Sequence, residues 1–170
     1  MDAIINRRSV REYDLSKKIE YNTLLELCKA AEAAPTARNQ RSREYIIIED
    51  EKIIEELSKV SKGSMILSKC NTVIAVIGRN KEEISTPHMQ DQDLACAVEN
   101  ILIKATDLCL GSCYIGIHPL EERVRACDEI LGVSGGAYTF ALVALGYPKD
   151  TEVFYDKNKF SDDLVHHNRY

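Results

Sequence analysis

The chain has 170 residues, of which 45% are hydrophobic and 29% are charged, and its formal net charge is −5 at pH 7. This length suits one domain with a substantial core, and the acidic charge balance argues against a nucleic-acid-binding protein. No apolar run reaches the roughly 18 residues of a membrane-spanning helix, and the first residues do not resemble a signal peptide, so we expect a cytoplasmic protein that binds neither membranes nor nucleic acid.

The N-terminal third is predicted to be mainly helical. Residues 2–7 suit a short helix and residues 10–13 an extended segment. A second helix is expected over about 20–33, because its apolar residues recur at spacings of three and four. Pro35 should end this helix, since proline disfavours the α conformation in the residue before it.

Three apolar runs rich in β-branched residues predict buried strands, at residues 44–49, 73–78 and 138–146. A helix is expected between the first two strands, because Ile53, Ile54, Leu57 and Val60 follow a helical spacing.

The longest helical pattern covers about residues 90–110, and Gly111 is well placed to cap its C-terminus. A short strand or loop at 113–117 and a helix at 119–131 should follow. The polar tail from residue 149 lacks core periodicity and is expected to lie across another surface. Alternating helices and strands indicate an α+β or three-layer α/β arrangement around a small mixed sheet.

The six cysteines are expected to be reduced, because no secretion signal accompanies them and no Cys-x-x-Cys pair is present. Cys109 and Cys113 are four residues apart and could face each other at a helix end, which leaves a redox pair as the alternative. The four histidines lack metal-ligand spacing, so we expect no metal site.

Four segments are candidates for binding a cofactor. Arg7, Arg8, Ser9 and Arg11 could hold a phosphate, because guanidinium groups bind it in a bidentate way. The alternative is a solvated basic patch. Lys157 and Lys159 would point to the same side of an extended tail and could add charge at that phosphate, or they belong to a solvated tail.

The other two candidate segments are turns rich in small residues. Residues 34–39, Ala-Pro-Thr-Ala-Arg-Asn, could bring backbone close to a flat ligand, with Asn39 as a donor; residues 111–116 could offer backbone donors to a flavin edge. An ordinary loop and an ordinary helix cap are the respective alternatives. Neither a Rossmann fingerprint nor a P-loop is present.

The order of these motifs resembles the nitroreductase family over essentially the whole chain. The matching segments are Arg7-Arg8-Ser9-Val10-Arg11, Ala34-Pro35-Thr36-Ala37-Arg38-Asn39, Leu110-Gly111-Ser112-Cys113-Tyr114-Ile115-Gly116 and Leu145-Gly146-Tyr147-Pro148. The resemblance implies a three-layer α+β fold with a mixed or antiparallel sheet, and an intertwined homodimer with FMN at the subunit interface. It also implies a single domain over residues 1–170, with the tail from about 149 packed on the partner.

The resemblance further assigns roles to residues of this chain. Arg7, Arg8 and Ser9 would hold the phosphate, ribityl and pyrimidine end of FMN. Because cations near the pyrimidine end favour the anionic reduced flavin, we expect Arg8 or Arg11 to contribute there. Pro35, Thr36, Ala37 and Asn39 would come from the partner subunit. Tyr114, Ile115 and Gly116 would line the isoalloxazine, and Lys157 and Lys159 would reach the phosphate.

The implied activity is hydride transfer from NADH or NADPH to flavin N5, followed by reduction of a small acceptor such as a nitroaromatic or a quinone. No side chain is expected to act as a nucleophile, because the flavin carries the chemistry. The alternatives are a flavin-binding storage or sensor protein without turnover, and a relative with specialised reductive chemistry. A metal or thiol redox protein is a further alternative.

The chain departs from the family at two points. Many members have Gln-Pro-Trp after the Asn of the turn, whereas this chain has Arg41-Ser42-Arg43. This difference predicts altered local packing and a more basic pocket. The short chain also predicts that the helical insertion over the flavin is missing, which leaves the substrate pocket more open.

Overall fold

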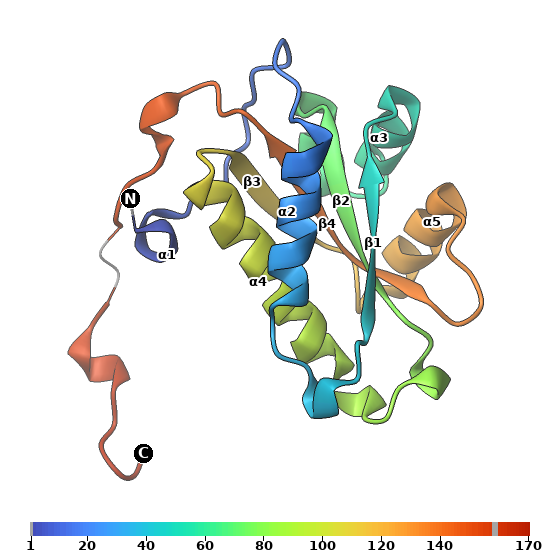
Figure 1. Ribbon diagram of the computed structural model, residues 1–170, viewed down its shortest axis with the longest axis vertical. Coiled ribbons are helices and arrows are strands. Elements are labelled where there is room, and N and C mark those ends of the chain that lie inside the picture. The colour runs from blue at the N-terminus through green and yellow to red at the C-terminus, as the bar shows by residue number, and fades with distance from the viewer. Residues whose placement is uncertain (1, 158–159) are drawn as a thin grey trace.

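A four-stranded sheet forms the middle layer of the computed structural model, which describes residues 2–157 and 160–170. The strands are β1 (Arg43–Ile48), β2 (Thr72–Gly78), β3 (Gly111–Gly116) and β4 (Tyr138–Gly146). They lie in the order β1-β2-β4-β3, and every neighbouring pair is antiparallel. The sheet is therefore antiparallel and not mixed, and β3 lies at its edge (Figure 1).

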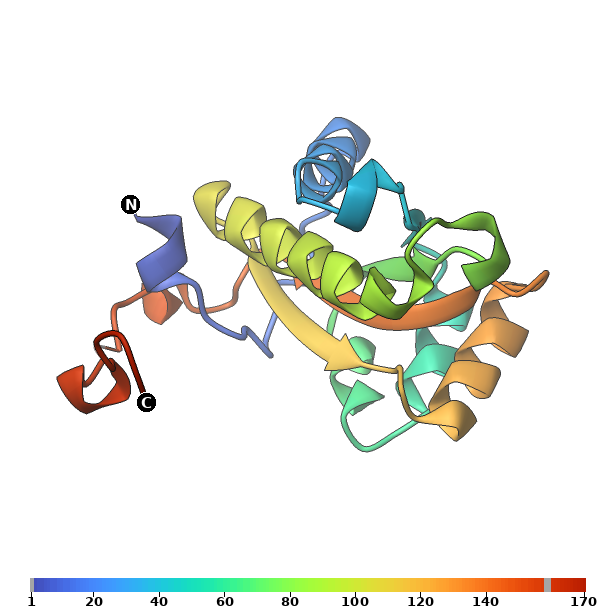
Figure 2. The same cartoon turned by 90° about the horizontal axis from the view of Figure 1, so that it is seen from below.

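Helices cover both faces of the sheet and complete the three-layer α+β fold. Figure 2 shows α2 (Tyr21–Glu32) and α4 (Gln90–Asp107) on one face, with α3 (Glu51–Ser58) and α5 (Glu121–Leu131) on the other. The short α1 (Ala3–Asn6) lies beside the C-terminal half of α4. Among the described residues, no helix is long and apolar enough to cross a membrane.

The core has two parts, one on each side of the sheet. Successive residues of β2 alternate between them, because neighbouring side chains of a strand point to opposite faces. Val73 and Ala75 pack on the side of α3 and α5, whereas Ile74 and Val76 pack on the side of α2 and α4. The predicted stripe of α4 is confirmed by its fully buried apolar side chains, which include Leu94, Ala97, Ile101 and Ala105.

The end of α4 differs from the prediction that Gly111 caps it. The helix ends at Asp107, and Cys109 adopts the left-handed conformation with φ 57°. Gly111 instead begins β3, and a Cβ on it would lie 2.8 Å from Cγ1 of Val10. A glycine is needed here because the N-terminal segment packs directly against the start of β3.

All six cysteines are free thiols. Cys109 is exposed in the turn after α4, whereas Cys113 is buried on β3, so the two do not face each other at a helix end. Burial raises the pKa of Cys113, and it raises the pKa of Cys70 to about 11 and that of Cys127 to about 12. These three thiols are packing groups of low reactivity at neutral pH.

The C-terminal tail leaves the body of the protein after β4. Figure 1 shows it passing α1 and extending away from the three layers. All residues of 160–170 are exposed, including Leu164 at 73% and Val165 at 63%.

Candidate cofactor site

The N-terminal basic segment and residues 156–157 of the tail line an open cavity of about 360 Å³. Ser9 forms a parallel bridge with Ser112, and the amide of Val10 donates to the carbonyl of Ser112 at 2.9 Å. These contacts fix the segment against the start of β3. The cavity is lined by Ile4, Ile5, Arg7, Arg8, Ser9, Asp156 and Lys157.

Arg8 has two donors without a partner in this cavity wall. Its Nη1 donates to the backbone carbonyls of Ile5 and Arg7, but Nε and Nη2 are buried and have no hydrogen-bond partner among the described residues. The guanidinium also lies 4.6 Å from the ring centroid of Tyr155. Buried charged donors without a partner are costly, so Arg8 is a candidate ligand for an anion bound in this cavity.

Of the other predicted phosphate ligands, some line this cavity and others do not. Arg7 pairs with Glu99 on α4 at 3.0 Å, and Lys157 lies in the cavity wall 5.9 Å from the ring centroid of Tyr155. Arg11 faces a separate hollow of about 370 Å³ and does not line the cavity. The prediction for Lys159 falls outside the described residues.

The turn at residues 35–39 is held by a buried carboxylate on α4. Asp93 accepts from the amide of Ala37 at 2.9 Å, from Nε2 of Gln40 at 2.7 Å and from Oγ of Ser42 at 2.8 Å. These bonds offset the backbone cost of Arg38 and Asn39, which both have φ of 52°. Pro35 and Asn39 are consequently exposed on a well-anchored turn.

Residues 41–43, which stand where many family members have Gln-Pro-Trp, include an arginine with a structural role that the sequence did not predict. Arg43 is buried, and its guanidinium bonds to the carbonyls of Ala34, Glu32 and Asp93 and pairs with the carboxylate of Glu32 at 3.1 Å. The predicted contribution of Arg43 to a more basic pocket is therefore wrong. The side chain fastens the end of α2 to α4.

The third predicted segment lies on the edge strand β3. Tyr114 is 40% exposed, and its ring lies over Gly116, where a Cβ would be 3.5 Å from the ring. Ile115 points to the opposite face and is buried in the core beside α3 and α5. Only its backbone could contact a ligand. Burial raises the pKa of Tyr114, and the charge of Asp91 raises it further.

A polar cluster that sequence reasoning missed lies just beyond this strand. Asp91 accepts from the hydroxyl of Tyr138 at 3.1 Å and lies 3.3 Å from Nε2 of His118. Burial and the nearby carboxylate hold the pKa of Tyr138 well above its usual value. Since these residues are far apart in sequence, no local spacing pointed to them.

The N-terminal segment and the turn at 37–39 lie in different parts of one chain. In Figure 1, α1 is at the left of the molecule, whereas the turn is the blue-cyan segment at its foot. Both are attached to α4, through Glu99 and Asp93 respectively.

Comparisons with known proteins agree with this architecture. The model of the nitroreductase family matches residues 4–69 and 65–147. A protein of Archaeoglobus fulgidus, provisionally named NADH dehydrogenase/NAD(P)H nitroreductase, is 33% identical over 98% of this chain and 96% of its own length.

Solved structures show the same similarity. A crystal structure from Clostridium acetobutylicum, provisionally named NADH oxidase, is 35% identical with a TM-score of 0.94, over 99% of this chain and 100% of the other. An FMN-dependent nitroreductase of Clostridium difficile has a TM-score of 0.89 at 24% identity, over 99% of both chains. The family match, the close relatives and the shared fold lead to one conclusion: this chain belongs to the nitroreductase family.

Proposed function

We propose that this protein is an FMN-dependent NAD(P)H oxidoreductase that acts as a homodimer and reduces a small acceptor such as a nitroaromatic or a quinone. The observation that carries the proposal is the pair of buried, unpartnered donors of Arg8 at a cavity beside β3. The names of relatives support it, because they include NAD(P)H nitroreductase and FMN-dependent nitroreductase.

The cavity residues fit the phosphate end of FMN. Arg8 would donate from Nε and Nη2, Ser9 offers an exposed hydroxyl at the same wall, and Lys157 adds a second positive charge. Arg7 is held by Glu99 and would act through its remaining donors. When bound, FMN would supply the hydride-accepting and electron-donating chemistry. The chain's own residues bind and orient it.

The edge strand β3 fits the flat isoalloxazine ring system of FMN. Gly116 leaves room that a side chain would fill, and Tyr114 flanks it with a partly exposed ring. The strand's outer edge bears one backbone bridge among the described residues, at Ser112, so amides further along could face the cofactor. Tyr114, the backbone of Ile115 and Gly116 are proposed to line the isoalloxazine.

A homodimer would complete this site. The turn containing Pro35, Thr36, Ala37 and Asn39 lies away from the Arg8 cavity of its own chain, and we propose that it reaches the cavity of the partner. The exposed apolar residues of the tail and α1, such as Leu164 and Ile4, would then be covered by the second subunit. The tail from about residue 149 would pack on that subunit. Residues 1–170 would form a single domain.

The test is the visible spectrum of the purified protein before and after anaerobic addition of NADH or NADPH. Flavin absorbance that either nucleotide bleaches, and that returns when a quinone or nitroaromatic is added, is the expected result. Bound flavin that neither nucleotide reduces would contradict turnover and indicate storage or sensing. A colourless protein that takes up no FMN would overturn the proposal.

A further inference from the structure

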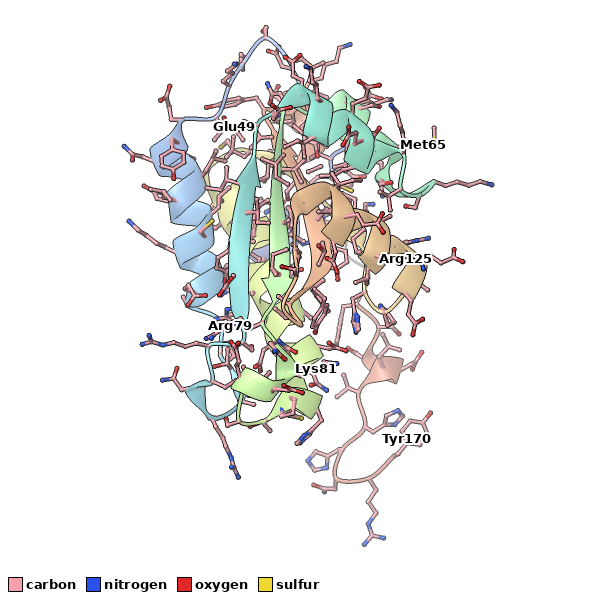
Figure 3. All side chains as sticks on the ribbon, turned by 90° about the vertical axis from the view of Figure 1, so that its right-hand side faces the viewer. Glu49, Met65, Arg79, Lys81, Arg125 and Tyr170 are labelled. Atoms are coloured by element: carbon pink, nitrogen blue, oxygen red, sulfur yellow. The ribbon has the colours of Figure 1, made fainter. Side chains whose placement is uncertain are left out.

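A groove outside the proposed cofactor site runs along α5. It has a volume of about 800 Å³, which is within the size range of small-molecule sites. The groove lies between one face of α5, the loop before β4 and the turn at His118 and Pro119. Figure 3 views this side of the molecule and labels Arg125 on α5.

The inner wall of the groove is apolar and aromatic. Val124 and Val133 contribute aliphatic surface, and the rings of His118 and Tyr138 lie with their centroids 4.8 Å apart. The Tyr138 ring already has a cation beside it, since Nζ of Lys81 is 5.5 Å from its centroid. A flat hydrophobic ligand could bury its surface against this wall.

The charged residues of the groove are mostly acidic. Four charged residues line it, namely Glu121, Asp128, Glu129 and the cation Arg125; a further cation, Lys81, lies beside the Tyr138 ring but is not part of the lining. None of these four residues forms an ion pair with another residue in the part of the chain that the structure describes. Asp128 uses one oxygen to accept from the amide and hydroxyl of Thr139, so its charge is fixed at the wall. The groove should therefore repel anions and attract cations.

The carboxylates do not form a metal site, because no three metal-ligating side chains converge among the described residues.

We infer that the α5 groove binds a flat organic cation, an aromatic ring system of one or two rings with a permanent positive charge. Its ring would pack on Val124, Val133 and the His118–Tyr138 pair. Its charge would lie near one of the carboxylates Glu121 and Glu129, which are about 12 Å apart along α5 at 1.5 Å per residue. This inference does not depend on the proposed function, since binding requires no flavin and no turnover.

The test compares three two-ring probes of similar size by isothermal titration calorimetry at neutral pH: the cation 1-methylquinolinium, neutral quinoline and the anion 1-naphthoate. The cation should bind at least several-fold more tightly than quinoline, and 1-naphthoate should not bind. The chain has four histidines, so the imidazole resonances are few, and the His118→Gln variant identifies the signal of His118. The cation should shift that signal and leave the other three unchanged.

A matched pair of variants tests the charge. The double variant Glu121→Gln/Glu129→Gln should weaken cation binding by about fivefold, because each exposed carboxylate contributes a modest attraction. Glu122→Gln removes an exposed carboxylate from the same helix but outside the groove, and should leave the affinity unchanged. Equal binding of quinoline and the cation would overturn the inference. So would equal affinities in the two variants, an unmoved His118 signal or no binding at all.

Discussion

At the scale of single residues, two side chains, Arg8 and Ser112, carry buried polar atoms that have no hydrogen-bond partner among the described residues, and the two cases lead to different interpretations. Arg8 lines a cavity and carries two charged donor atoms without a partner, whereas the Oγ atom of Ser112 is enclosed beneath the N-terminal segment. A charged donor at a cavity indicates a ligand, whereas an enclosed hydroxyl without a partner indicates a stability cost. Each interpretation leads to a measurable consequence.

Arg8→Ala should weaken FMN binding by about 10- to 100-fold, because it removes up to two charge-assisted hydrogen bonds. The measurement is a fluorescence titration of FMN into the flavin-free protein. Arg125→Ala, which removes an exposed arginine outside the cavity, is the control and should bind FMN normally. Unchanged affinity of Arg8→Ala would refute its assignment as a phosphate ligand.

Ser112→Ala should raise the free energy of unfolding of the flavin-free protein by about 1 kcal/mol, because it removes a buried hydroxyl that has no partner. Urea denaturation measures this change. Ser68→Ala is the matched control, since the Ser68 hydroxyl is exposed and donates to the carbonyl of Met65 at 2.8 Å. A loss of stability in Ser112→Ala would show that this hydroxyl finds a partner in solution.

At the scale of elements, α4 positions both proposed halves of the site. Asp93 near its start holds the turn at 37–39, and Glu99 further along holds Arg7. The apolar stripe of the helix was visible in the sequence because burial repeats with the helical period. The roles of Asp93 and Glu99 were not visible, because they depend on partners 56 and 92 residues away, namely Ala37 and Arg7.

Asp93→Asn should lower the free energy of unfolding by about 2–3 kcal/mol, because three donors converge on this buried carboxylate and an amide nitrogen would oppose at least one of them. Asp107→Asn, which alters an exposed ion pair with Lys104, should cost less than about 0.5 kcal/mol. Equal losses in the two variants, measured by urea unfolding, would rule out the anchoring role of Asp93.

At the scale of the whole molecule, the fold class and most element boundaries followed from local patterns, whereas contacts between distant segments did not. The helix over about 20–33 is observed at Tyr21–Glu32, and all three predicted strands are present. β2 and β4 are buried as predicted, whereas β1 lies at an edge of the sheet and is only partly buried. The start of β3 was misjudged because the need for Gly111 comes from Val10, about a hundred residues earlier. Arg43 was misjudged for the same reason, since its partner Asp93 is on another element.

The proposed dimer must bring the turn of one chain to the Arg8 cavity of the other, and this requirement constrains its interface. The anchors of these two segments, Asp93 and Glu99, are about 9 Å apart along α4 at 1.5 Å per residue. Exchange of the segments between subunits therefore draws the exposed face of α4 towards its counterpart. Cys96 lies on that face between the two anchors and is exposed in the single chain.

Cys96 should consequently be protected from iodoacetamide in the dimer and become reactive when dilution dissociates it. Cys109, exposed in the turn after α4, serves as the internal reference for the intrinsic labelling rate. Mass spectrometry of the labelled peptides, with light scattering at the same concentrations, measures both quantities. If Cys96 in the dimer reacts as fast as Cys109, the interface does not include the exposed face of α4. The proposed contact between the turn at 35–39 and the partner's Arg8 cavity would then be wrong.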